Sequence, residues 1–407
     1  MTEQHQTARC ENTKVKHIAI LGSTGSIGTS TLSICEQFPD RYIPIALAVG
    51  SNLEAAFEQA KKWHPHLISI ATEPLADALA LKLKQAGITG IEVVHGTSGT
   101  IAVATHPQVD FVVSAIVGVA GLEATYAAAK AGKHIGLANK ECLVAAGDLI
   151  IAAARANNVA LLPIDSEHNA IHQCLRGGAS NEVAQIWLTA SGGPFRNTPI
   201  EQFASITPAQ ALKHPTWVMG QRITIDSATL LNKGLEVIEA CRLFDLPPAQ
   251  VRVTVHPQST VHSLVEFIDG SILAQISVTD MRLPILYALA YPERPAAQHI
   301  PALKFDLATL SQLDFSPPDF GRFPCLRLAY EAAASAPSAC IALNAADEIA
   351  VDAFLKGRIP FLGIPSTIER VLELTPAAHP ESIPEVLAAD QAARICAQQV
   401  ISASNRY

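Results

Sequence analysis

Short apolar runs alternate with amphipathic stretches along the first 164 residues of the chain. The apolar runs predict strands at residues 16–21, 42–49, 67–70, 110–116, 133–138 and 159–164. The amphipathic stretches between them predict helices at residues 29–38, 53–64, 122–131 and 147–157. Strands that alternate with helices are typical of a parallel, doubly wound α/β sheet. In such sheets ligands bind beyond the carboxyl ends of the strands.

The pattern changes after residue 169. A strand is predicted at 183–189, a helix from Ser227 onward, and a strand-rich stretch over 251–278. Residues 300–322 are rich in proline, leucine and aspartate and are typical of a linker. Helical spacing then dominates at residues 325–334, 339–356, 366–374 and 390–404. The sequence therefore predicts a central α+β region followed by a linker and a helical C-terminal region.

Composition narrows the classes of protein. The 407 residues are 49% hydrophobic and 16% charged, which predicts two or three domains with large cores. A net charge of -8 argues against general nucleic-acid binding. No apolar run reaches the ~18–20 residues of a membrane span, and the polar N-terminus lacks a signal-peptide core. Eight cysteines without a Cys-x-x-Cys pair indicate reduced thiols, as in a cytoplasmic protein.

A glycine-rich turn follows the first predicted strand. Gly22-Ser-Thr-Gly-Ser-Ile-Gly28 lies between that strand and a helix, where glycine lets the backbone approach a pyrophosphate. Its hydroxyls and the helix N-terminus add donors for the anion. The alternative is a structural tight turn. The strand-turn-helix context favours dinucleotide binding.

The end of the second predicted strand bears on which dinucleotide binds. An acid at this position would bind the ribose 2′-hydroxyl of NAD. This chain has Gly50-Ser51-Asn52 instead, without an acid and without an adjacent Arg or Lys. The sequence favours NADP.

Two acids follow the last strand of this region. Asp165 and Glu167 come directly after an apolar run, and in an extended segment they would point to the same side. Their like charges would then favour a bound cation, and carboxylates suit Mg²⁺ or Mn²⁺. The alternative is a helix start, with Asp165 or Ser166 as N-cap and the acids facing the helix dipole.

Two segments of the middle region suggest further ligand contacts. Ala190-Ser-Gly-Gly-Pro194 is a small-residue turn that suits either a phosphate nest or a simple β-turn. Residues 207–220 carry His214, Trp217 and a Met between Pro and Gly residues, which suggests a lid that closes over a ligand. The alternative is a connecting loop whose Trp fills a core gap.

The segment 223–240 carries a donor set next to an acid. Ser227, Asn232 and Lys233 offer hydroxyl, amide and ammonium donors that suit a phosphate dianion. Lys233 and Glu236 share a helix face, so a surface salt bridge is the alternative. Glu236 lies at the edge of an apolar face, where an acid needs a partner. It is a candidate third carboxylate for Asp165 and Glu167.

The motifs together resemble the 1-deoxy-D-xylulose 5-phosphate reductoisomerase family, from about residue 16 to about residue 400. The resemblance rests on Gly22–Gly28, Ala138-Asn-Lys-Glu141, Ile164-Asp-Ser-Glu-His-Asn-Ala170, Ala190-Ser-Gly-Gly-Pro-Phe195, His214-Pro-Thr-Trp-Val-Met-Gly220, Asp226-Ser-Ala-Thr-Leu-Leu-Asn-Lys-Gly-Leu-Glu236, His256-Pro-Gln-Ser259 and Asp269-Gly-Ser271. The Asp-Ser-Glu and Asn-Lys-Gly-Leu-Glu pieces are the most specific part.

The resemblance implies a role for each matching residue. One Mg²⁺ or Mn²⁺ per subunit would be held by Asp165, Glu167 and Glu236. Catalysis would involve these three acids and Lys140. Substrate contacts would come from Lys140, Ser166, Glu167, Ser191, His214, Trp217, Ser227, Asn232, Lys233 and Glu236. NADPH contacts would come from Thr24, Gly25, Ser26, Ile27, Gly50, Ser51, Asn52, Asn139, Glu141 and Gly220. Many members of the family carry a basic residue where this chain has Ser51.

The resemblance also implies the reaction and the architecture. The substrate would rearrange to a branched aldehyde, which NADPH would reduce to 2-C-methyl-D-erythritol 4-phosphate in the non-mevalonate isoprenoid pathway. The expected parts are a disordered segment at 1–15, a Rossmann-like NADPH domain at 16–164, and a catalytic and dimerisation domain at 165–298 with a lid near 207–221. A linker at 299–322 and a helical bundle at 323–407 would follow. We expect a homodimer that pairs through residues 251–278.

Other candidate residues have plainer interpretations. His168, His172, His256 and His262 are interpreted as core histidines rather than zinc ligands. Asp347 and Glu348 are interpreted as a solvated helix face. Two rival functions remain: an NADP-linked dehydrogenase with Cys142 as thiol nucleophile, and a non-catalytic NADP-sensing protein.

Overall fold

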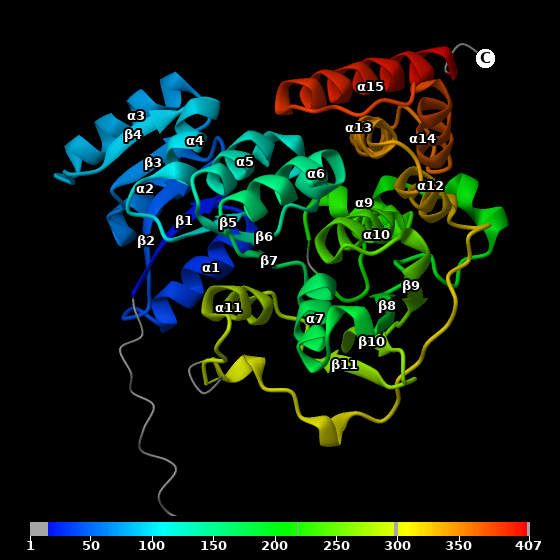
Figure 1. The fold of residues 1–407 in the computed structure, drawn as a ribbon. Coiled ribbons are helices and arrows are strands. Elements are labelled where there is room, and N and C mark those ends of the chain that lie inside the picture. The colour runs from blue at the N-terminus through cyan, green and yellow to red at the C-terminus, as the bar shows by residue number, and fades with distance from the viewer. Residues whose placement is uncertain (1–14, 218, 297–299, 405–407) are drawn as a thin grey trace, which may run out of the picture.

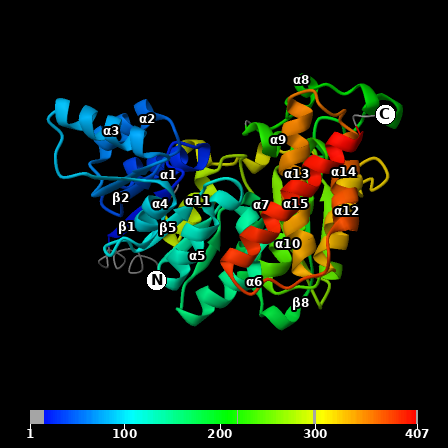
Figure 2. The ribbon, with the colours of Figure 1, turned by 90° about the horizontal axis from the view of Figure 1, so that it is seen from above.

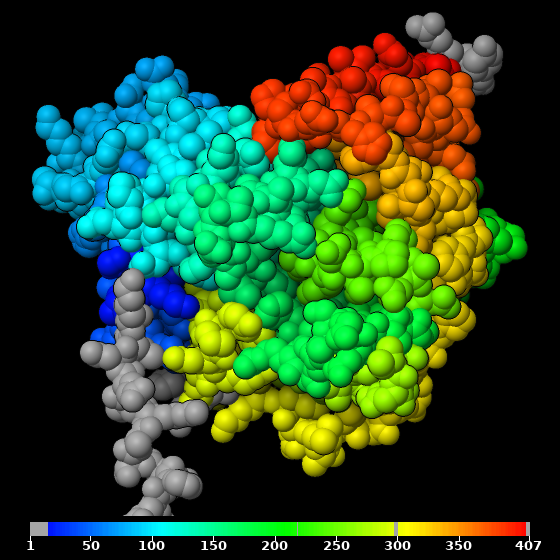
Figure 3. All heavy atoms as spheres, in the orientation of Figure 1, coloured from blue at the N-terminus to red at the C-terminus, as the bar shows by residue number. Residues whose placement is uncertain are grey.

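A computed structural model describes residues 15–217, 219–296 and 300–404 of the chain. The predicted disordered N-terminus, residues 1–15, lies outside the described residues except for Val15. In Figure 1 the N-terminal region, blue to cyan, lies at the left, and the C-terminal helices, orange to red, lie at the upper right. The green middle region lies between them, and the space-filling view shows the three regions packed against one another (Figure 3).

The N-terminal region is built on a seven-stranded sheet. Its strand order is β4-β3-β2-β1-β5-β6-β7, and every neighbouring pair is parallel. The strands are β1 Lys16–Leu21, β2 Tyr42–Ala48, β3 Leu67–Ile70, β4 Glu92–His95, β5 Phe111–Ser114, β6 His134–Leu137 and β7 Leu161–Pro163. Helices between them are α1 Ser26–Gln37, α2 Leu53–Trp63, α3 Glu73–Gln85, α4 Gly96–Thr105, α5 Leu122–Lys130 and α6 Lys140–Ala156. The predicted Rossmann-like α/β fold is confirmed.

Three elements of this sheet region are not among the predicted elements. β4 is a short, half-exposed edge strand and α4 is rich in Gly and Thr, so both carry little signal, whereas α3 is rich in Ala, Leu and Lys and was missed although its sequence favours a helix. α6 begins at Lys140, seven residues before the predicted start, and its backbone departs from helical geometry at Ala146. The early start matters for function because it places Lys140 and Glu141 in the first turn of α6.

The middle region contains a second, smaller sheet. Its order is β11-β10-β8-β9, with β8 Val183–Ala190, β9 Val251–Val255, β10 Val261–Phe267 and β11 Ile272–Ile276. β8 and β9 are parallel, and the other pairs are antiparallel. The helices are α7 Ser166–Cys174, α8 Pro208–Ala211, α9 Gln221–Ala228, α10 Leu231–Phe244 and α11 Arg282–Ala290. α7 and α10 both contact this sheet.

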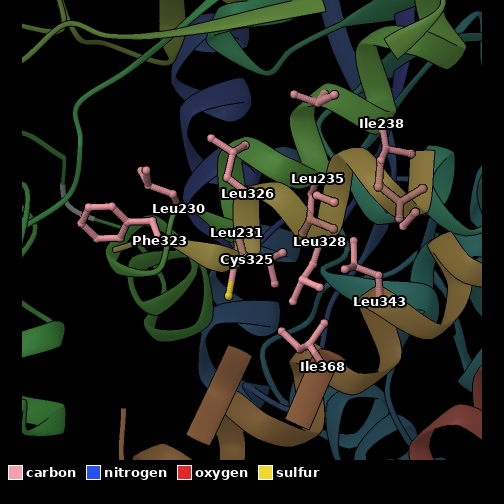
Figure 4. Close-up of a cluster of buried hydrophobic side chains, with 14 of the residues drawn as sticks. Leu230, Leu231, Leu235, Ile238, Phe323, Cys325, Leu326, Leu328, Leu343 and Ile368 are labelled. Carbon is pink, nitrogen blue, oxygen red and sulfur yellow. The ribbon is translucent and has the colours of Figure 1, made fainter. Parts of the chain in front are cut away.

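The C-terminal region consists of α12 Pro324–Ala333, α13 Pro337–Leu355, α14 Gly363–Leu374 and α15 Ile383–Ser404. All four predicted helices are present. The preceding segment crosses the molecule, as the yellow trace in Figure 1 shows, and its described residues include the short 3-10 turns Pro301–Leu303 and Leu307–Thr309 and a β-bridge between Ser316 and Val255. Figure 4 shows the core in which Leu231 and Leu235 of α10 meet Leu326 of α12 and Leu343 of α13. Burial of such side chains contributes about 1.5–3 kcal/mol each, so this contact fixes the bundle on the middle region.

The C-terminal helices also reach the N-terminal region. α13 and α15 both contact α6, and Figure 2 shows α15 passing over the α6 end of the molecule. Helix α6, which begins at Lys140, is therefore covered by α13 and α15 of the C-terminal region. Of the helices that the structure describes, none is both long enough and apolar enough to cross a bilayer.

Candidate active site at the carboxyl edge of the parallel sheet

Asp165 and Glu167 lie at a helix start, not on an extended segment. β7 ends at Pro163, Asp165 is the N-cap residue of α7, and Glu167 is in its first turn. The expectation that i and i+2 in a strand bring the acids together is therefore wrong, and the helix-start alternative describes the backbone. Ser166 donates a hydrogen bond to Glu167 Oε2 at 2.5 Å. What brings the acids into one group is a pair of lysines.

The two lysines join the acids through Glu236. Lys140 Nζ lies 2.5 Å from Asp165 Oδ2 and 3.2 Å from Glu236 Oε1. Lys233 Nζ lies 2.6 Å from Glu167 Oε1 and also contacts Glu236 Oε2. We call these five residues the carboxylate–lysine cluster. Its three acids outnumber its two ammonium groups, so it retains one excess negative charge when all are ionised.

Burial and the neighbouring charges shift the pKa values of the groups in this cluster. Glu236 is 1% exposed, and burial together with neighbouring Glu167 raises its pKa to about 7 despite both lysines. Burial also raises the pKa of Asp165, but Lys140 outweighs it and holds that pKa below its usual value. Burial lowers the pKa of Lys140, yet Asp165 and Glu236 outweigh it and keep the ammonium charged. The site thus has one carboxylate that ionises fully only when more positive charge arrives.

The donor set fits a hard divalent cation. Ligand atoms of Asp165, His168 and Glu236 lie within 4.8 Å of one another, and Glu167 lies outside this tight group. His168 Nε2 is 2.9 Å from the Glu236 carbonyl oxygen, and Nδ1 is 3.4 Å from Glu239 Oε2. Nε2 is thus engaged by the α10 backbone, whereas Nδ1 has no hydrogen-bond partner, and the carboxylate oxygens of Asp165 and Glu236 are the harder ligands of the group. Oxygen donors of this kind suit Mg²⁺ or Mn²⁺.

A second group of side chains lies where the resemblance expects phosphate contacts. His214 Nε2 is 3.1 Å from Ser191 Oγ and 3.0 Å from Ser227 Oγ. Asn232 and Lys233 are instead directed to Glu236, which accepts a hydrogen bond from Asn232 at 2.5 Å. The structure therefore brings the two serines and His214 together, and it ties the other two predicted phosphate residues to the carboxylate–lysine cluster.

Backbone geometry holds the two serines close. Gly193 has φ +66°, and a Cβ there would lie 2.6 Å from the Ser227 carbonyl oxygen. Only glycine lets the turn after β8 press against the end of α9. The predicted single helix from Ser227 is in fact two helices, because Leu230 has φ 60° and separates α9 from α10. This change of direction at Leu230 turns the first turn of α10 toward Glu167, which Lys233 contacts.

The predicted lid lies beside the group formed by Ser191, Ser227 and His214. Thr207 and Gln210 form a capping box at the start of α8. His214 Nδ1 accepts a hydrogen bond from the Trp217 backbone N–H at 2.9 Å, and the Trp217 ring is 6.5 Å from the His262 ring. Val218 lies outside the described residues. Trp217 is half-buried, so it neither fills a core gap nor stands free in solvent.

The glycine turn provides a cradle at the carboxyl end of β1. A Cβ on Gly28 would lie 2.3 Å from the Gly22 carbonyl oxygen, so helix α1 packs on the turn only because that residue is glycine. Gly25 is the N-cap of α1 and contributes no side-chain cap. The N–H groups of the first turn are thus available to an anion, with Thr24, Ser26 and Ile27 around them. This geometry fits a dinucleotide pyrophosphate.

The other predicted cofactor residues follow β2 and β6, except for Gly220, which is the N-cap residue of α9. Gly50, Ser51 and Asn52 follow β2 and are exposed, but Asn52 caps α2 by accepting from the Ala55 N–H at 3.0 Å. Its side-chain oxygen is therefore used as an acceptor, whereas its amide N–H groups and the Ser51 hydroxyl are the donors that this segment offers to a phosphate. Asn139 caps α6 and donates to the Gly118 carbonyl oxygen at 2.9 Å.

Two features of the site were not found from the sequence. His168 was interpreted as a core residue, and it is buried, but it also supports the acids through α10. The interpretation of Asp347 and Glu348 as a solvated face is wrong, because Asp347 is 0% exposed and both acids bind Arg222. A run of alternating polar and apolar residues gives no sign of a partner 125 positions away.

Cys142 does not suit nucleophilic catalysis. It is fully buried in α6, its thiol contacts Thr125 Oγ1, and burial raises its pKa. A catalytic thiol needs exposure and a lowered pKa. The structure thus favours the carboxylate site over the thiol dehydrogenase alternative.

Profiles of known protein families match three parts of the chain. Residues 18–147 match the profile described as 1-deoxy-D-xylulose 5-phosphate reductoisomerase, and residues 161–244 match the one described as its C-terminal domain. Residues 276–396 match the profile described as DXP reductoisomerase C-terminal domain.

Curated relatives match along nearly their whole length. The 1-deoxy-D-xylulose 5-phosphate reductoisomerase of Solibacter usitatus (strain Ellin6076) is 50% identical over 389 residues, which covers 95% of this chain and 97% of the relative. That of Dechloromonas aromatica (strain RCB) is 50% identical over 395 residues, covering 96% and 98%.

Solved structures with the same fold include ligand complexes. The reductoisomerase from Zymomonas mobilis in complex with NADPH has a TM-score of 0.88 and 44% identity, covering 95% of this chain and 99% of that one. A DOX-P reductoisomerase with NADPH, fosmidomycin and magnesium has a TM-score of 0.88 and 43% identity, covering 95% and 98%.

Proposed function

This chain belongs to the 1-deoxy-D-xylulose 5-phosphate reductoisomerase family, and from that premise we propose how its residues carry the reaction. It converts 1-deoxy-D-xylulose 5-phosphate to 2-C-methyl-D-erythritol 4-phosphate with NADPH and a divalent metal, in the non-mevalonate isoprenoid pathway. The observation that carries the assignment is the carboxylate–lysine cluster, which lies at the same edge of the parallel sheet as the glycine turn.

Asp165, Glu167 and Glu236 are the proposed metal ligands. When bound, the cation supplies Lewis-acid polarisation of substrate oxygens, and NADPH supplies the hydride. Support comes from the raised pKa of Glu236, whose ionisation is favoured by added positive charge. Glu167 is further from the other ligand atoms, so its side chain must turn away from Lys233 to join them.

Lys140 and Ser166 are the proposed contacts to the reacting end of the substrate. Lys140 is buried, charged and within 3.2 Å of both Asp165 and Glu236. An ammonium at this position stabilises developing oxyanion charge and orients a hydroxyl for proton transfer. Ser166 lies between the two acids in sequence and offers a hydroxyl at the helix start.

The remote phosphate is the proposed ligand of Ser191, Ser227, Asn232, Lys233 and His214. Two serines already linked by His214 need little rearrangement to receive phosphate oxygens. Because the phosphate group binds away from the reacting carbons, its binding keeps the cleaved fragments aligned for rejoining. Trp217 and the lid at 207–221 exclude water above them.

The NADPH contacts are proposed at the three strand ends. Thr24, Gly25, Ser26 and Ile27 hold the pyrophosphate at the start of α1. Gly50, Ser51 and Asn52 face the 2′-phosphate end, where Ser51 supplies the hydroxyl. Asn139 and Glu141 flank Lys140 and are already fixed by side-chain contacts, and Gly220 contributes from the N-cap of α9.

We further infer the division of labour among the regions. Residues 16–164 bind the cofactor, residues 165–298 carry catalysis and pairing, and residues 323–407 form the helical domain after a linker at 299–322. A homodimer is proposed because β11 is an edge strand with exposed Ile272 and Leu273, beside exposed Ile268. A cytoplasmic location is proposed because the seven described cysteines are unpaired.

The test is NADPH oxidation, followed by absorbance, with purified protein and 1-deoxy-D-xylulose 5-phosphate. We expect turnover that stops with excess EDTA and returns with Mg²⁺ or Mn²⁺. Turnover that is insensitive to EDTA, or absent with metal present, would contradict the proposal. The product is identified as 2-C-methyl-D-erythritol 4-phosphate by mass and NMR.

A further inference from the structure

One arginine joins three helices of the fold, α6, α9 and α13. The Arg222 guanidinium donates to Asp347 Oδ2 at 3.1 Å and 3.2 Å, to Asn344 Oδ1 at 2.8 Å and to Glu348 Oε1 at 2.7 Å. It also donates to Glu141 Oε1 at 3.3 Å and lies 3.6 Å from Asp226 Oδ2. We call these six residues the Arg222 cluster.

The cluster is largely buried, and Asp226 Oδ1, Asn344 Nδ2 and Asp347 Oδ1 lie in it without a hydrogen-bond partner. The Arg222 side chain is 17% exposed, and Asp347 is 0% exposed. Burial lowers the pKa of Arg222, but Asp347 and Asp226 outweigh it, so the guanidinium stays charged. On its outer side Glu348 also accepts a hydrogen bond from Arg394 of α15 at 2.5 Å, and Arg394 binds Asp390. A buried cation with four carboxylates around it is costly unless each contact is held in place.

The elements that meet at Arg222 are those that frame the cofactor edge. Glu141 follows Lys140 in the first turn of α6, and Arg222 lies two residues after Gly220, at the end of the lid. Gly118 is pressed on the same cluster, because a Cβ there would lie 2.8 Å from Glu348 Oε1 and 3.7 Å from an Arg222 nitrogen. The other side of the cluster is α13 and α15, from the C-terminal region.

We propose that Arg222 is a positioning residue for the NADPH-dependent reaction, which fixes the first turn of α6 and the start of α9 against the C-terminal helices. The proposal rests on the proposed function above. Through Glu141 it sets the place of Lys140, and through the start of α9 it sets where the lid ends. The C-terminal helices thus act on the active site without contributing a residue to the chemistry.

The planar fork of arginine is what this role needs. Its donors diverge in one plane and reach acceptors on α6, α9 and α13 at once. A lysine ammonium keeps the charge but is a single point, so it reaches only some of these acceptors. The Arg222→Lys variant therefore separates the charge from the geometry.

The experiment compares Arg222→Met, Arg222→Lys and a control, Arg155→Met. Arg155 is on the other end of α6, and its pair with Asp245 is 3.4 Å long with side chains 70% and 85% exposed. The dissociation constant of NADPH is measured by fluorescence titration, the KM for NADPH and kcat are measured with saturating sugar phosphate, and the thermal midpoint is recorded for each protein.

For Arg222→Met we expect the KM and the dissociation constant of NADPH to rise about tenfold or more, with kcat falling by a similar factor. Arg222→Lys recovers part of both, and Arg155→Met stays within about twofold of wild type. The folded Arg222→Met protein with an unchanged NADPH dissociation constant would overturn the proposal. So would a loss of activity that equals the loss of folded protein.

If Arg222→Met does not fold, Glu348→Gln decides. This change removes the charge that Arg222 and Arg394 share, and we expect a rise of about threefold to tenfold in the NADPH dissociation constant. No rise would overturn the proposal. Because NADPH binding needs no turnover, a wild-type protein that binds NADPH but does not convert the sugar phosphate contradicts the proposed function and still leaves the role of Arg222 testable.

Discussion

Two buried charge clusters lie close together in this molecule, and they differ in the cation that compensates the acids. In the carboxylate–lysine cluster, two ammonium groups are shared among three acids. In the Arg222 cluster, one guanidinium is shared among four acids and an amide. Both carry excess negative charge in a site from which water is largely excluded.

The difference in cation separates a site that can exchange its ligands from one that cannot. An ammonium is a point charge on a flexible stem, so Lys233 can leave Glu167 when a metal or a phosphate arrives. A guanidinium bound through several divergent donors leaves only if all of its contacts break together. We infer that the carboxylate–lysine cluster binds ligands and that the Arg222 cluster holds the helices around it in fixed positions.

The largest effect is expected from neutralising the shared acid of the first cluster. In Glu236→Gln we expect kcat to fall by about 10³-fold, or about 4 kcal/mol, because a metal ligand and the counter-charge of both lysines are lost. The fold should persist, since burial and Glu167 raise the pKa of Glu236, which lowers the cost of a neutral side chain at this position. The measurements are NADPH oxidation and the thermal midpoint.

The matched control is Glu239→Gln, one turn further along α10. Glu239 is equally buried, and burial with Asp165 raises its pKa well above the usual value, but it faces His168 at 3.4 Å rather than a lysine. We expect kcat within about tenfold of wild type. Equal losses in the two variants would break the distinction between an acid that binds metal and an acid that is merely buried.

The sequence anticipated the first cluster better than the second. Asp165 and Glu167 are neighbours that follow an apolar run, and Lys233 and Glu236 share one helix turn, so local pattern reveals most of that cluster. Local pattern did not give the backbone at Asp165, because a strand end and a helix start share the same short polar run. The lysines that bridge the acids come from elements joined only by tertiary packing.

The Arg222 cluster could not be predicted because four of the five partners of Arg222 are 81 to 126 positions away, and only Asp226 is near it in sequence. Asp347 and Glu348 occupy adjacent positions of α13, and a helix with two acids usually exposes them. The same reasoning explains the elements that were found and missed. Long periodic helices such as α13 and α15 were predicted, and the Gly- and Thr-rich α4 was not.

An intermediate effect is expected on stability, from the pH dependence of Asp347. Burial raises its pKa to about 6, above the unfolded value of 3.8. The folded state then binds the Asp347 proton more tightly than the unfolded state does. The stability that this carboxyl group contributes is therefore fully present below about pH 4 and is lost as pH rises through about 6. Linkage over these ~2 units gives a loss of about 3 kcal/mol at most.

Asp347→Asn tests this assignment because it keeps an acceptor for Arg222 and removes the proton. We expect urea unfolding between pH 4 and pH 7 to show a smaller decline in the variant than in wild type. The difference between the two proteins isolates Asp347 from other acids, such as Asp226, whose pKa burial and Asp347 also raise. Parallel pH profiles of the unfolding free energy would mean that Asp347 does not titrate within the Arg222 cluster over this pH range.

The smallest effect is expected at an exposed arginine that has two carboxylate partners, compared with four around Arg222. Arg327 of α12 lies 2.8 Å from Glu331 and 2.8 Å from Glu369, and its side chain is 42% exposed. Water already solvates such pairs, so we expect Arg327→Met to change the free energy of unfolding by less than about 1 kcal/mol and to leave the NADPH dissociation constant unchanged. Urea unfolding and fluorescence titration check both values. If Arg327→Met were as harmful as Arg222→Met, burial and the joining of separate helices would not explain the effect, and the positioning role of Arg222 would be contradicted.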